Sequence, residues 1–551
     1  MILAVLFKLQ NHTLMKVYKS FSLFLLLGLA ACSTQKDEPL QPLDDVMMQA
    51  FYWDVPVDDQ AKNGTWWNHL REIASELRVA GISSLWTPIP AKGNWGIYDS
   101  GYGIYDHYDL GNYEQKGTVE TRYGSRAELG LMIATMHKAG IKVYSDVVLN
   151  HLYGGDENFE ANPAVTAYAK GGLRLGEAKA GHGEPYPESD IQWKNDTAYT
   201  RTHLFFPKHT GNGEPNYEWH YQHFHPSSAS DSLTDFTDDE LRPRTKFFGN
   251  DLDTYNEEVQ QRLCDWGKWL KGTIGFDGFR LDFVRGLQPE FVSLWVEGLP
   301  LQDGKQPFIV GEYWAENGRY IKEWVDSVAK GGADVHAFDF PLKFALTEMC
   351  NKSGDEFDMS RLAHAGMIRG YGLPADNIVT FVDNHDTGKE HDKWLVKDYA
   401  MAYAYILTHE GTPCVFYPHF YAVTQHDVDN PSLEVTSPSD LQQTIRQLID
   451  IRRQYLGGTL AVLTESDKHL YVARRQGNGV KDGAIIVLNN HDTDTLSITL
   501  NVCPDGFTDW SGQTLVNLLN PNETITISND GQATLSAPKR YFSIWTLQNN
   551  R

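Results

Sequence analysis

Acidic, basic and imidazole side chains follow directly on several short apolar runs of this sequence. Such runs are typical of buried strands, so a charged group at the end of one marks a candidate site. Four carboxyl residues, an asparagine, an arginine and two histidines occur in this position. The groups are Asp146, Asn150 and His151 after one run, Arg280 and Asp282 after a second, Glu312 after a third, and His385 and Asp386 after a fourth.

Carboxyl groups in unlike environments can divide acid and base work between them. A neutral carboxylic acid can protonate a leaving oxygen, while an ionised carboxylate stabilises a centre that resembles an oxocarbenium ion. Cleavage of a glycosidic bond needs both roles. Arg280 lies two residues before Asp282 and so on the same face of its strand, where its guanidinium would keep that carboxylate ionised.

The apolar runs alternate with longer amphipathic segments, a pattern typical of βα units around a parallel sheet. Strands are expected at residues 46–53, 81–88, 141–149, 276–283, 308–314, 335–340, 378–382 and 412–417. Helices are expected at residues 66–80, from the capping box of Ser125 and Glu128 to Gly140, and at residues 440–455. We therefore predict an α/β fold, a (β/α)8 TIM barrel, in which polar residues at the carboxyl ends of the strands share one pocket.

The alternation of strands and helices is interrupted once. Residues 152–250 are rich in Gly, Pro, His and aromatic residues and show no periodicity. Because structureless connections of this length are rare inside compact domains, we interpret the stretch as an inserted domain after the third strand. It would divide the barrel domain into two parts, residues 46–151 and 251–458.

The character of the sequence changes again after Gly457 and Gly458. Leu496, Ile498 and Leu500 alternate there with polar residues, which indicates half-buried antiparallel strands. We predict a C-terminal antiparallel β-sandwich domain over residues 459–551.

The N-terminus resembles a bacterial lipoprotein signal. Lys16 and Lys19 precede an apolar run that ends in Leu29-Ala-Ala-Cys32. The run is about ten residues long, too short to cross a hydrocarbon core of roughly 30 Å as a helix. This resemblance implies that residues 1–32 are a signal peptide, that Cys32 is lipidated, and that residues 33–45 form a tether. We expect an exported, membrane-anchored lipoprotein of the outer membrane or cell surface, with an ordinary cleaved signal as the alternative.

The net charge narrows the class of molecule that the protein can bind, and the cysteine spacing bears on disulfides. Acidic residues outnumber basic ones by 72 to 48, giving a net charge of -24, which repels nucleic acid and suits a neutral partner. We expect no nucleic-acid partner and a monomeric chain. The remaining cysteines are widely spaced, lack a CxxC pattern and assign no disulfide: Cys264, Cys350, Cys414 and Cys503.

The strand-end residues belong to longer motifs that resemble the four ordered motifs of the α-amylase family. These are Asp146-Val-Val-Leu-Asn-His151, Gly278-Phe-Arg-Leu-Asp282, Gly311-Glu312 and Phe381-Val-Asp-Asn-His-Asp386. The likeness extends to Met48-Gln-Ala-Phe-Tyr-Trp53, Gly101-Tyr-Gly-Ile-Tyr105 and Gln115-Lys-Gly-Thr-Val119, and so covers nearly the whole chain after the tether. In wording the motifs are similar to those of plant, archaeal and bacterial α-amylases.

The resemblance implies retaining hydrolysis of internal α-1,4-glucosidic bonds in starch, glycogen or maltodextrins. Asp282 would be the nucleophile, Glu312 the general acid and then base, and Asp386 the group that stabilises the transition state. Asp146 would shape the site. Tyr102 would stack on the sugar at the cleavage point, unless it is a packed core tyrosine. The other residues expected to bind substrate are Arg280, His151, His385 and Arg285.

Calcium is the expected cofactor. Asn150 and Asp251 lie at the two ends of the insertion, and hard oxygen ligands suit Ca²⁺. The resemblance adds the backbone carbonyl of Gly286. Many family members carry Lys and His where this chain has Arg285 and Gly286, whereas plant and archaeal amylases share the glycine. Further ligands from the insertion are unranked among Asp231, Asp235 and Asp238.

Two other functions fit the same residues. A 4-α-glucanotransferase would use the same catalytic set, and a non-catalytic glucan-binding lipoprotein could retain the barrel without needing all three carboxyl groups. A separate group, His220, His223 and His225, could suggest zinc, but neither cysteine nor an HExxH pattern accompanies it. We therefore interpret these histidines as packing at the surface or against sugar.

Overall fold

The computed structural model describes residues 44–154, 160, 203–206, 214–225 and 249–548. The chain divides into two units, Met1–Pro42 and Leu43–Arg551, and the described residues all belong to the second. The predicted signal peptide, Cys32 and residues 33–43 of the predicted tether lie outside them. Within the described ranges, no helix combines the length and apolar character needed to cross a bilayer.

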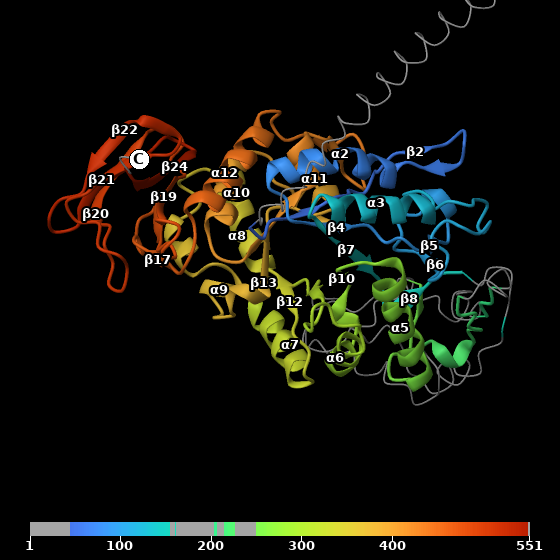
Figure 1. The fold of residues 1–551 in the computed structure, drawn as a ribbon. Coiled ribbons are helices and arrows are strands. Elements are labelled where there is room, and N and C mark those ends of the chain that lie inside the picture. Colours follow the sequence, from blue (N-terminus) through green and yellow to red (C-terminus); the bar gives the residue numbers. More distant parts are fainter. Residues whose placement is uncertain (1–43, 155–159, 161–202, 207–213, 226–248, 549–551) are drawn as a thin grey trace, which may run out of the picture. The chain divides into compact units, whose positions relative to one another are not determined.

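Eight parallel strands close into a barrel, as predicted (Figure 1). The first strand closes the ring because Met47 pairs with both Cys414 and Ser84. The strands are short and almost entirely buried, since helices cover the outside of the barrel. In chain order they are β1 (Met47–Gln49), β4 (Ser84–Thr87), β7 (Lys142–Val147), β10 (Gly278–Leu281), β11 (Phe308–Gly311), β12 (His336–Phe338), β13 (Ile378–Phe381) and β14 (Thr412–Phe416).

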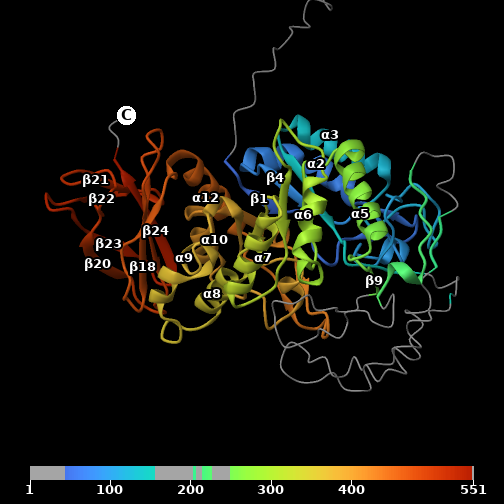
Figure 2. The same cartoon turned by 90° about the horizontal axis from the view of Figure 1, so that it is seen from below.

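Helices connect successive strands and surround the barrel (Figures 1 and 2). The predicted capping box is present, with Ser125 and Glu128 satisfying each other's backbone amides. The predicted helix from residue 66 ends at Gly81, whose φ of 88° only glycine adopts readily. The helices are α2 (Trp66–Ala80), α3 (Arg126–Lys138), α5 (Glu257–Trp269), α6 (Pro289–Glu297), α7 (Gly318–Lys330), α8 (Phe340–Asn351), α10 (Tyr399–Thr408) and α12 (Leu441–Tyr455).

A two-stranded ladder joins the beginning and the end of the predicted insertion. In it β8 (His151–Leu152) pairs antiparallel with β9 (Asn250–Asp251), and His151 lies opposite Asp251. The ladder sits directly after barrel strand β7, so the segment between its strands leaves and re-enters the barrel at one point. Of that segment, residues 153–154, 160, 203–206, 214–225 and 249 are described.

The C-terminal region forms two antiparallel sheets. The larger has the order β17-β18-β19-β24-β21-β22, and the smaller pairs β20 with β23. Strand β20 alternates half-buried and exposed residues, as its sequence predicts. The bounds are β17 (Leu460–Val462), β18 (Leu470–Arg475), β19 (Ala484–Asn489), β20 (Leu496–Asn501), β21 (Thr514–Asn517), β22 (Asn520–Thr526), β23 (Gln532–Ala537) and β24 (Tyr541–Leu547).

The central strands of the larger sheet are buried on both faces. Val472 and Val487 pack with Leu535 of the smaller sheet, forming a core within the C-terminal region. Tyr471 and Ile486, which point to the opposite face, belong to the same apolar cluster as the barrel. The C-terminal sheet therefore shares a hydrophobic interface with the barrel domain.

Candidate active site

The register of three neighbouring barrel strands brings the predicted polar residues together. Arg280 of β10 pairs with Asp146 of β7 across the sheet, so the two side chains lie at the same level of the barrel. One step further along, the backbone amide of Asp282 donates to Val147 and that of Glu312 donates to Leu281. The carboxyl groups therefore meet at the carboxyl-terminal mouth of the barrel, where sites of this fold lie.

Arg280 is fully buried and contacts three carboxyl groups. Its Nη1 donates to Asp146 at 2.8 and 3.0 Å and to Asp282 Oδ1 at 2.7 Å. Its Nη2 lies 2.8 Å from Glu312 Oε1 in an ion pair. The guanidinium also lies over the ring of Trp86, 5.1 Å from the centroid. One cation thus holds three acids in fixed positions, because a planar guanidinium presents its donors in set directions.

The three acids that contact Arg280 are buried and close together. Their mutual repulsion and the loss of solvent oppose the ionisation of all three at once. Burial raises the pKa of Asp282 to about 7 and that of Glu312 to about 7, although Arg280 acts to lower both. Burial likewise raises the pKa of Asp146 to about 6. Carboxyl groups this close therefore retain a proton near neutral pH.

Hydrogen bonding decides which acid keeps that proton. Asp282 accepts a charge-assisted hydrogen bond from Arg280, which favours its ionised form. Glu312 Oε1 faces the same guanidinium without hydrogen-bond geometry, and this buried oxygen has no hydrogen-bond partner among the described residues. The arrangement favours an ionised Asp282 beside a protonated Glu312.

Asp386 extends the site from the next but one strand, β13. Its Oδ1 lies 2.7 Å from Lys389 Nζ, and its Oδ2 lies 3.3 Å from His385 Nε2. Although burial acts to raise the pKa of Asp386, His385, Lys389 and Arg280 hold it well below its ordinary value. Asp386 is therefore an anion at any pH at which the protein would work.

His385 is fixed by partners on both ring nitrogens. Gln49 Nε2 lies 2.8 Å from Nδ1, and the Tyr102 hydroxyl lies 2.7 Å from Nε2. Because Tyr102 donates to Asp146 at 2.8 Å, a proton on Nε2 of His385 satisfies the whole chain of contacts. Burial lowers the pKa of His385 to about 3, so the ring is neutral.

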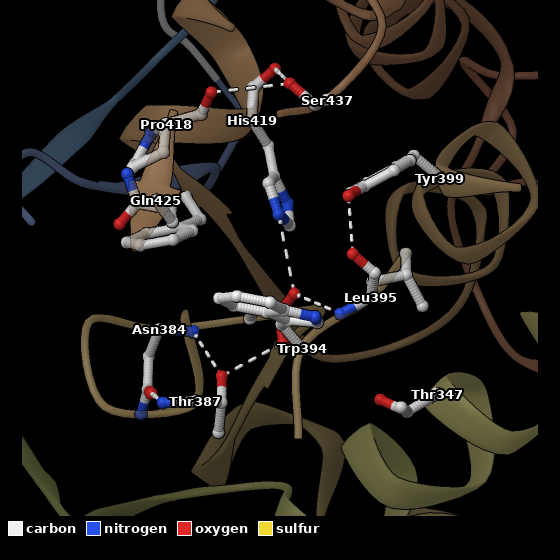
Figure 3. Close-up of polar contacts among 12 residues, drawn as sticks. Thr347, Asn384, Thr387, Trp394, Leu395, Tyr399, Pro418, His419, Gln425 and Ser437 are labelled. Atoms are coloured by element: carbon white, nitrogen blue, oxygen red, sulfur yellow. Dashed lines mark hydrogen bonds and ion pairs between the residues drawn. The ribbon is translucent and has the colours of Figure 1, made fainter. Parts of the chain in front are cut away.

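A second ionic cluster holds the loop that carries His385 and Asp386 (Figure 3). Asp383 is buried and lies 2.9 Å from Lys343 of α8 and 3.4 Å from His419 of α11 (Tyr417–Tyr421). It also accepts from the Thr387 hydroxyl at 2.9 Å and from the Leu395 amide at 2.9 Å. The loop is therefore tied through Asp383 to two surrounding helices.

Asn384 closes the same loop onto itself. Its Oδ1 accepts from the amides of Asp386 at 3.0 Å and Thr387 at 2.8 Å. This side-chain turn sets the backbone direction at Asp386 and so the direction of its carboxylate.

Three aromatic rings lie nearly parallel beside the acids. Tyr102 and His385 are inclined by 4° with centroids 5.2 Å apart, and Trp53 lies 6.0 Å from Tyr102 at 11°. Tyr102 and Trp53 are half-buried and so offer part of their surface to the site. Lys389 Nζ lies over the Trp53 ring at 3.4 Å from its centroid.

The other predicted substrate residues lie on two sides of this centre. His151 is buried, its Nε2 is 2.9 Å from the Tyr102 carbonyl, and burial lowers its pKa to about 4. Arg285 donates to the Trp314 carbonyl at 2.9 Å and lies over the Tyr313 ring. Arg285 therefore flanks the strand end that carries Glu312.

The predicted calcium ligands form a group at the base of the insertion. Asn150 and Asp251 are buried, and Asn150 Nδ2 donates to Asp251 Oδ1 at 3.0 Å. A Cβ on Gly286 would lie 2.0 Å from Asn150 Oδ1, so this amide oxygen faces the backbone of Gly286 and needs a glycine there. An amide oxygen, a buried carboxylate and a backbone segment meet here, a donor set that fits Ca²⁺. Asp231, Asp235 and Asp238 lie outside the described residues.

Sequence reasoning missed Trp53, Gln49 and Lys389. Trp53 and Gln49 lie within a quoted motif, but nothing in one sequence says that its residues face His385. Lys389 lies three residues after Asp386, which is a contact distance only once the backbone turns in the short 3₁₀ segment Thr387–Lys389. The described cysteines, Cys264, Cys350, Cys414 and Cys503, are free thiols.

The chain is similar to known proteins over most of its length. A family profile described as "Alpha amylase, catalytic domain" matches residues 81–451. An α-amylase of Geobacillus stearothermophilus is 32% identical over 95% of this chain and 90% of that protein. The cytoplasmic α-amylase of Escherichia coli K12 is 27% identical over 91% of this chain and 98% of that protein.

Solved structures agree on the fold. The α-amylase of Geobacillus thermoleovorans, solved with acarbose, has a TM-score of 0.60 at 19% identity and covers 92% of this chain and 99% of its own. A cyclomaltodextrin glucanotransferase with a three-domain ABC distribution has a TM-score of 0.61 at 19% identity, with 92% and 100% coverage. Barrel and acid cluster together define a (β/α)8 glycoside hydrolase. Within that class, the chain belongs to the α-amylase family.

Replacing Lys389 by Met should lower kcat/KM and leave the acidic limb of its pH profile in place. The ammonium group of Lys389 lies 2.7 Å from Asp386 Oδ1, so its removal frees this carboxylate to move and raises its pKa from a value so low that it stays ionised. Misplacing a group that stabilises the transition state should lower kcat/KM by roughly 10–100-fold, whereas the acidic limb follows Asp282, whose pKa is about 7. Lys393→Met, which removes a lysine paired with Glu390, is the matched control and should leave kcat/KM unchanged. Wild-type kcat/KM in Lys389→Met would show that Lys389 does not position Asp386.

Proposed function

We propose that this enzyme hydrolyses internal α-1,4-glucosidic bonds of starch, glycogen or maltodextrins with retention of anomeric configuration. The observation that carries the proposal is that Asp282 and Glu312 contact the two terminal nitrogens of one guanidinium. Carboxyl groups bridged by a single arginine lie close together, as retaining enzymes require, with separations of about 5–5.5 Å. Two of the similar proteins are named α-amylases, which supports an activity on α-glucans.

In the first step the ionised Asp282 carboxylate attacks the anomeric carbon as the glycosidic C–O bond breaks. Glu312 transfers its proton to the departing oxygen, so the leaving group departs as a neutral alcohol. A covalent glycosyl–enzyme ester remains on Asp282. Asp386, held ionised by Lys389 and His385, stabilises the positive charge that develops on the sugar ring.

In the second step Glu312, now ionised, removes a proton from water. The resulting hydroxide attacks the anomeric carbon, and the bond to Asp282 breaks. Both residues return to their starting protonation states, and two inversions give net retention. Arg280 contacts both acids throughout and compensates the charge that moves between them.

Two substitutions and one stereochemical measurement test this proposal. Glu312→Gln should lower kcat on amylose by at least roughly 10²–10⁴-fold, and Asp282→Asn should abolish turnover, in proteins that still fold. Proton NMR of fresh wild-type products should show the α-anomer first. Near-normal turnover in either variant, or initial release of the β-anomer, would contradict the assignment.

The products separate hydrolysis from glucan transfer. Hydrolysis gives rising reducing ends and short maltooligosaccharides, whereas a 4-α-glucanotransferase gives lengthened or cyclic glucans at constant reducing ends. The same assay separates both enzymes from a non-catalytic glucan-binding protein, which would leave both the number of reducing ends and the lengths of the glucan chains unchanged. The complete set of acids favours catalysis.

We further propose that Asn150, Asp251 and the Gly286 carbonyl hold Ca²⁺. The supporting observation is that the Asn150 side chain contacts Asp251 and turns its amide oxygen toward the backbone of Gly286, at the ladder of β8 and β9, where an ion would join the insertion to the barrel. Removing calcium with a chelator should lower the melting temperature, and added Ca²⁺ should restore it. Asp251→Asn should weaken this response. A melting temperature that ignores chelation would exclude a structural calcium ion.

The lipid anchor at Cys32 is also a proposal, and it rests on the signal-like sequence that precedes this residue. If it is correct, the enzyme acts on glucan at the cell envelope. Cys32→Ala should release the protein from the membrane fraction and abolish incorporation of radiolabelled palmitate. Membrane association that survives this substitution would refute the anchor.

A further inference from the structure

A short antiparallel pairing within the insertion sorts its side chains onto two faces. Leu204 and Trp219 exchange backbone hydrogen bonds of 3.1 and 2.8 Å. Both side chains are buried and belong to the main apolar cluster. Because neighbours along a strand alternate between faces, His203, Glu218 and His220 all point away from this core. The spacing of the residues in the sequence does not predict that His203 lies near Glu218 and His220.

The two outward imidazoles, those of His203 and His220, both face one carboxylate oxygen of Glu218. His203 Nε2 lies 2.7 Å from Glu218 Oε1, and His220 Nε2 lies 3.8 Å from the same atom. The ligand atoms of the three residues all lie within 4.8 Å of one another. Tetrahedral zinc with bonds of about 2.0–2.1 Å would place its ligands roughly 3.3 Å apart, so small side-chain rotations suffice.

A second carboxylate sets the orientation of one imidazole. Glu160 Oε1 lies 3.1 Å from His220 Nδ1, and Glu160 Oε2 accepts from the Tyr221 amide at 2.9 Å. With Nδ1 turned toward Glu160, His220 presents Nε2 to Glu218 and His203. A carboxylate behind a histidine is the usual support of a metal-binding imidazole. The rings of His203 and His220 are stacked, with centroids 5.1 Å apart and an inclination of 12°.

The backbone under these residues is fixed to the barrel domain. Arg262 of α5 donates to the Glu218 carbonyl at 2.9 Å. Its guanidinium also lies over the rings of Trp219 and Tyr217, 4.7 and 4.9 Å from their centroids. The ligands on this strand are therefore preorganised, which lowers the ordering cost of binding an ion.

The histidines named from sequence are used differently. His223 Nδ1 accepts from the His220 amide, and its Nε2 lies 3.4 Å from Glu258. His225 Nε2 lies 3.6 Å from Asp253. Within the described part of the chain, the convergent group therefore contains His220 without its two neighbours.

We propose that His203, Glu218 and His220 form a binding site for a divalent transition-metal ion, best suited to Zn²⁺, with Glu160 as its orienting carboxylate. Two imidazoles and one carboxylate are a donor set that zinc accepts, and imidazole favours it over the hard ions that suit Asn150 and Asp251. The partly exposed side chains leave a coordination position open to water. The ion joins the strand segments at His203 and at Glu218–His220 and so stabilises the insertion.

Zinc binding to the full, tag-free chain tests the proposal, with saturating Ca²⁺ present throughout so that the other proposed ion is constant. Calorimetric titration with Zn²⁺ should give one site per chain, and Zn²⁺ should raise the melting temperature. His203→Gln and His220→Gln should each abolish that site. Glu160→Gln should weaken it roughly 10–100-fold, as loss of an orienting partner does. Co²⁺ should give the visible absorption of a tetrahedral site in the wild type only.

The control is His137→Gln. His137 is also a partly exposed imidazole paired with one carboxylate, that of Asp277, but among the residues that the structure describes it belongs to no convergent group. This variant should bind Zn²⁺ as the wild type does. Glu218→Gln, a conservative change at an exposed side chain, replaces either histidine variant that fails to fold. Wild-type zinc affinity in the His203 and His220 variants, or no zinc binding by the wild-type chain, would overturn the proposal.

Discussion

The buried guanidinium of Arg280 is the interaction on which the active site depends. A charge with no solvent exposure is stable only with close counter-charges, and here Asp146, Asp282 and Glu312 supply them. Removing one partner from such a network typically costs about 3–5 kcal/mol, because the remaining charge stays buried. The same contacts determine the protonation of the site. They place three acids around one cation, so the acids together retain a proton, and Glu312 carries it. Structural stability and catalytic protonation therefore rest on the same atoms.

The rest of the fold supplies what this network needs. Strands β7, β10 and β11 must keep their register, because a shift by one residue would turn Arg280 away from the barrel interior. The loop after β13 is tied down separately, through Asp383, Lys343 and His419, and carries Asp386 with its own cation, Lys389. The insertion is attached where β8 and β9 pair, close to the first acid-bearing strand. Each supporting group keeps a charged side chain in place through partners distant in the sequence.

Much of the architecture could be predicted because local sequence patterns specify it. Apolar runs gave all eight barrel strands, and the capping box at Ser125 and the glycine at Gly81 marked helix ends correctly. Strand lengths were overestimated, as at residues 46–53 against Met47–Gln49, because residues beyond the ladder turn into the site while remaining apolar. The double burial of β18 and β19 was not foreseen, since an all-apolar strand does not reveal which domain covers its second face. The sequence places His220 near His223 and His225, whereas the fold also stacks it on His203, which is distant in sequence and adjacent only through the pairing of Leu204 with Trp219.

The sequence by itself determined the fold class, the order of strands and helices, and the identity of the acids at the strand ends, because periodicity and local motifs encode these directly. Only the tertiary structure decided how those acids differ from one another. Arg280 donates a hydrogen bond to Asp282 but contacts Glu312 only as an ion pair, and Asp386 lies beside Lys389 and a neutral His385. Ionisation depends on burial and on the distance to every neighbouring charge, and those distances are set by strand register and loop conformation. Which carboxyl group holds a proton is therefore a property of the folded barrel, not of the order of its residues.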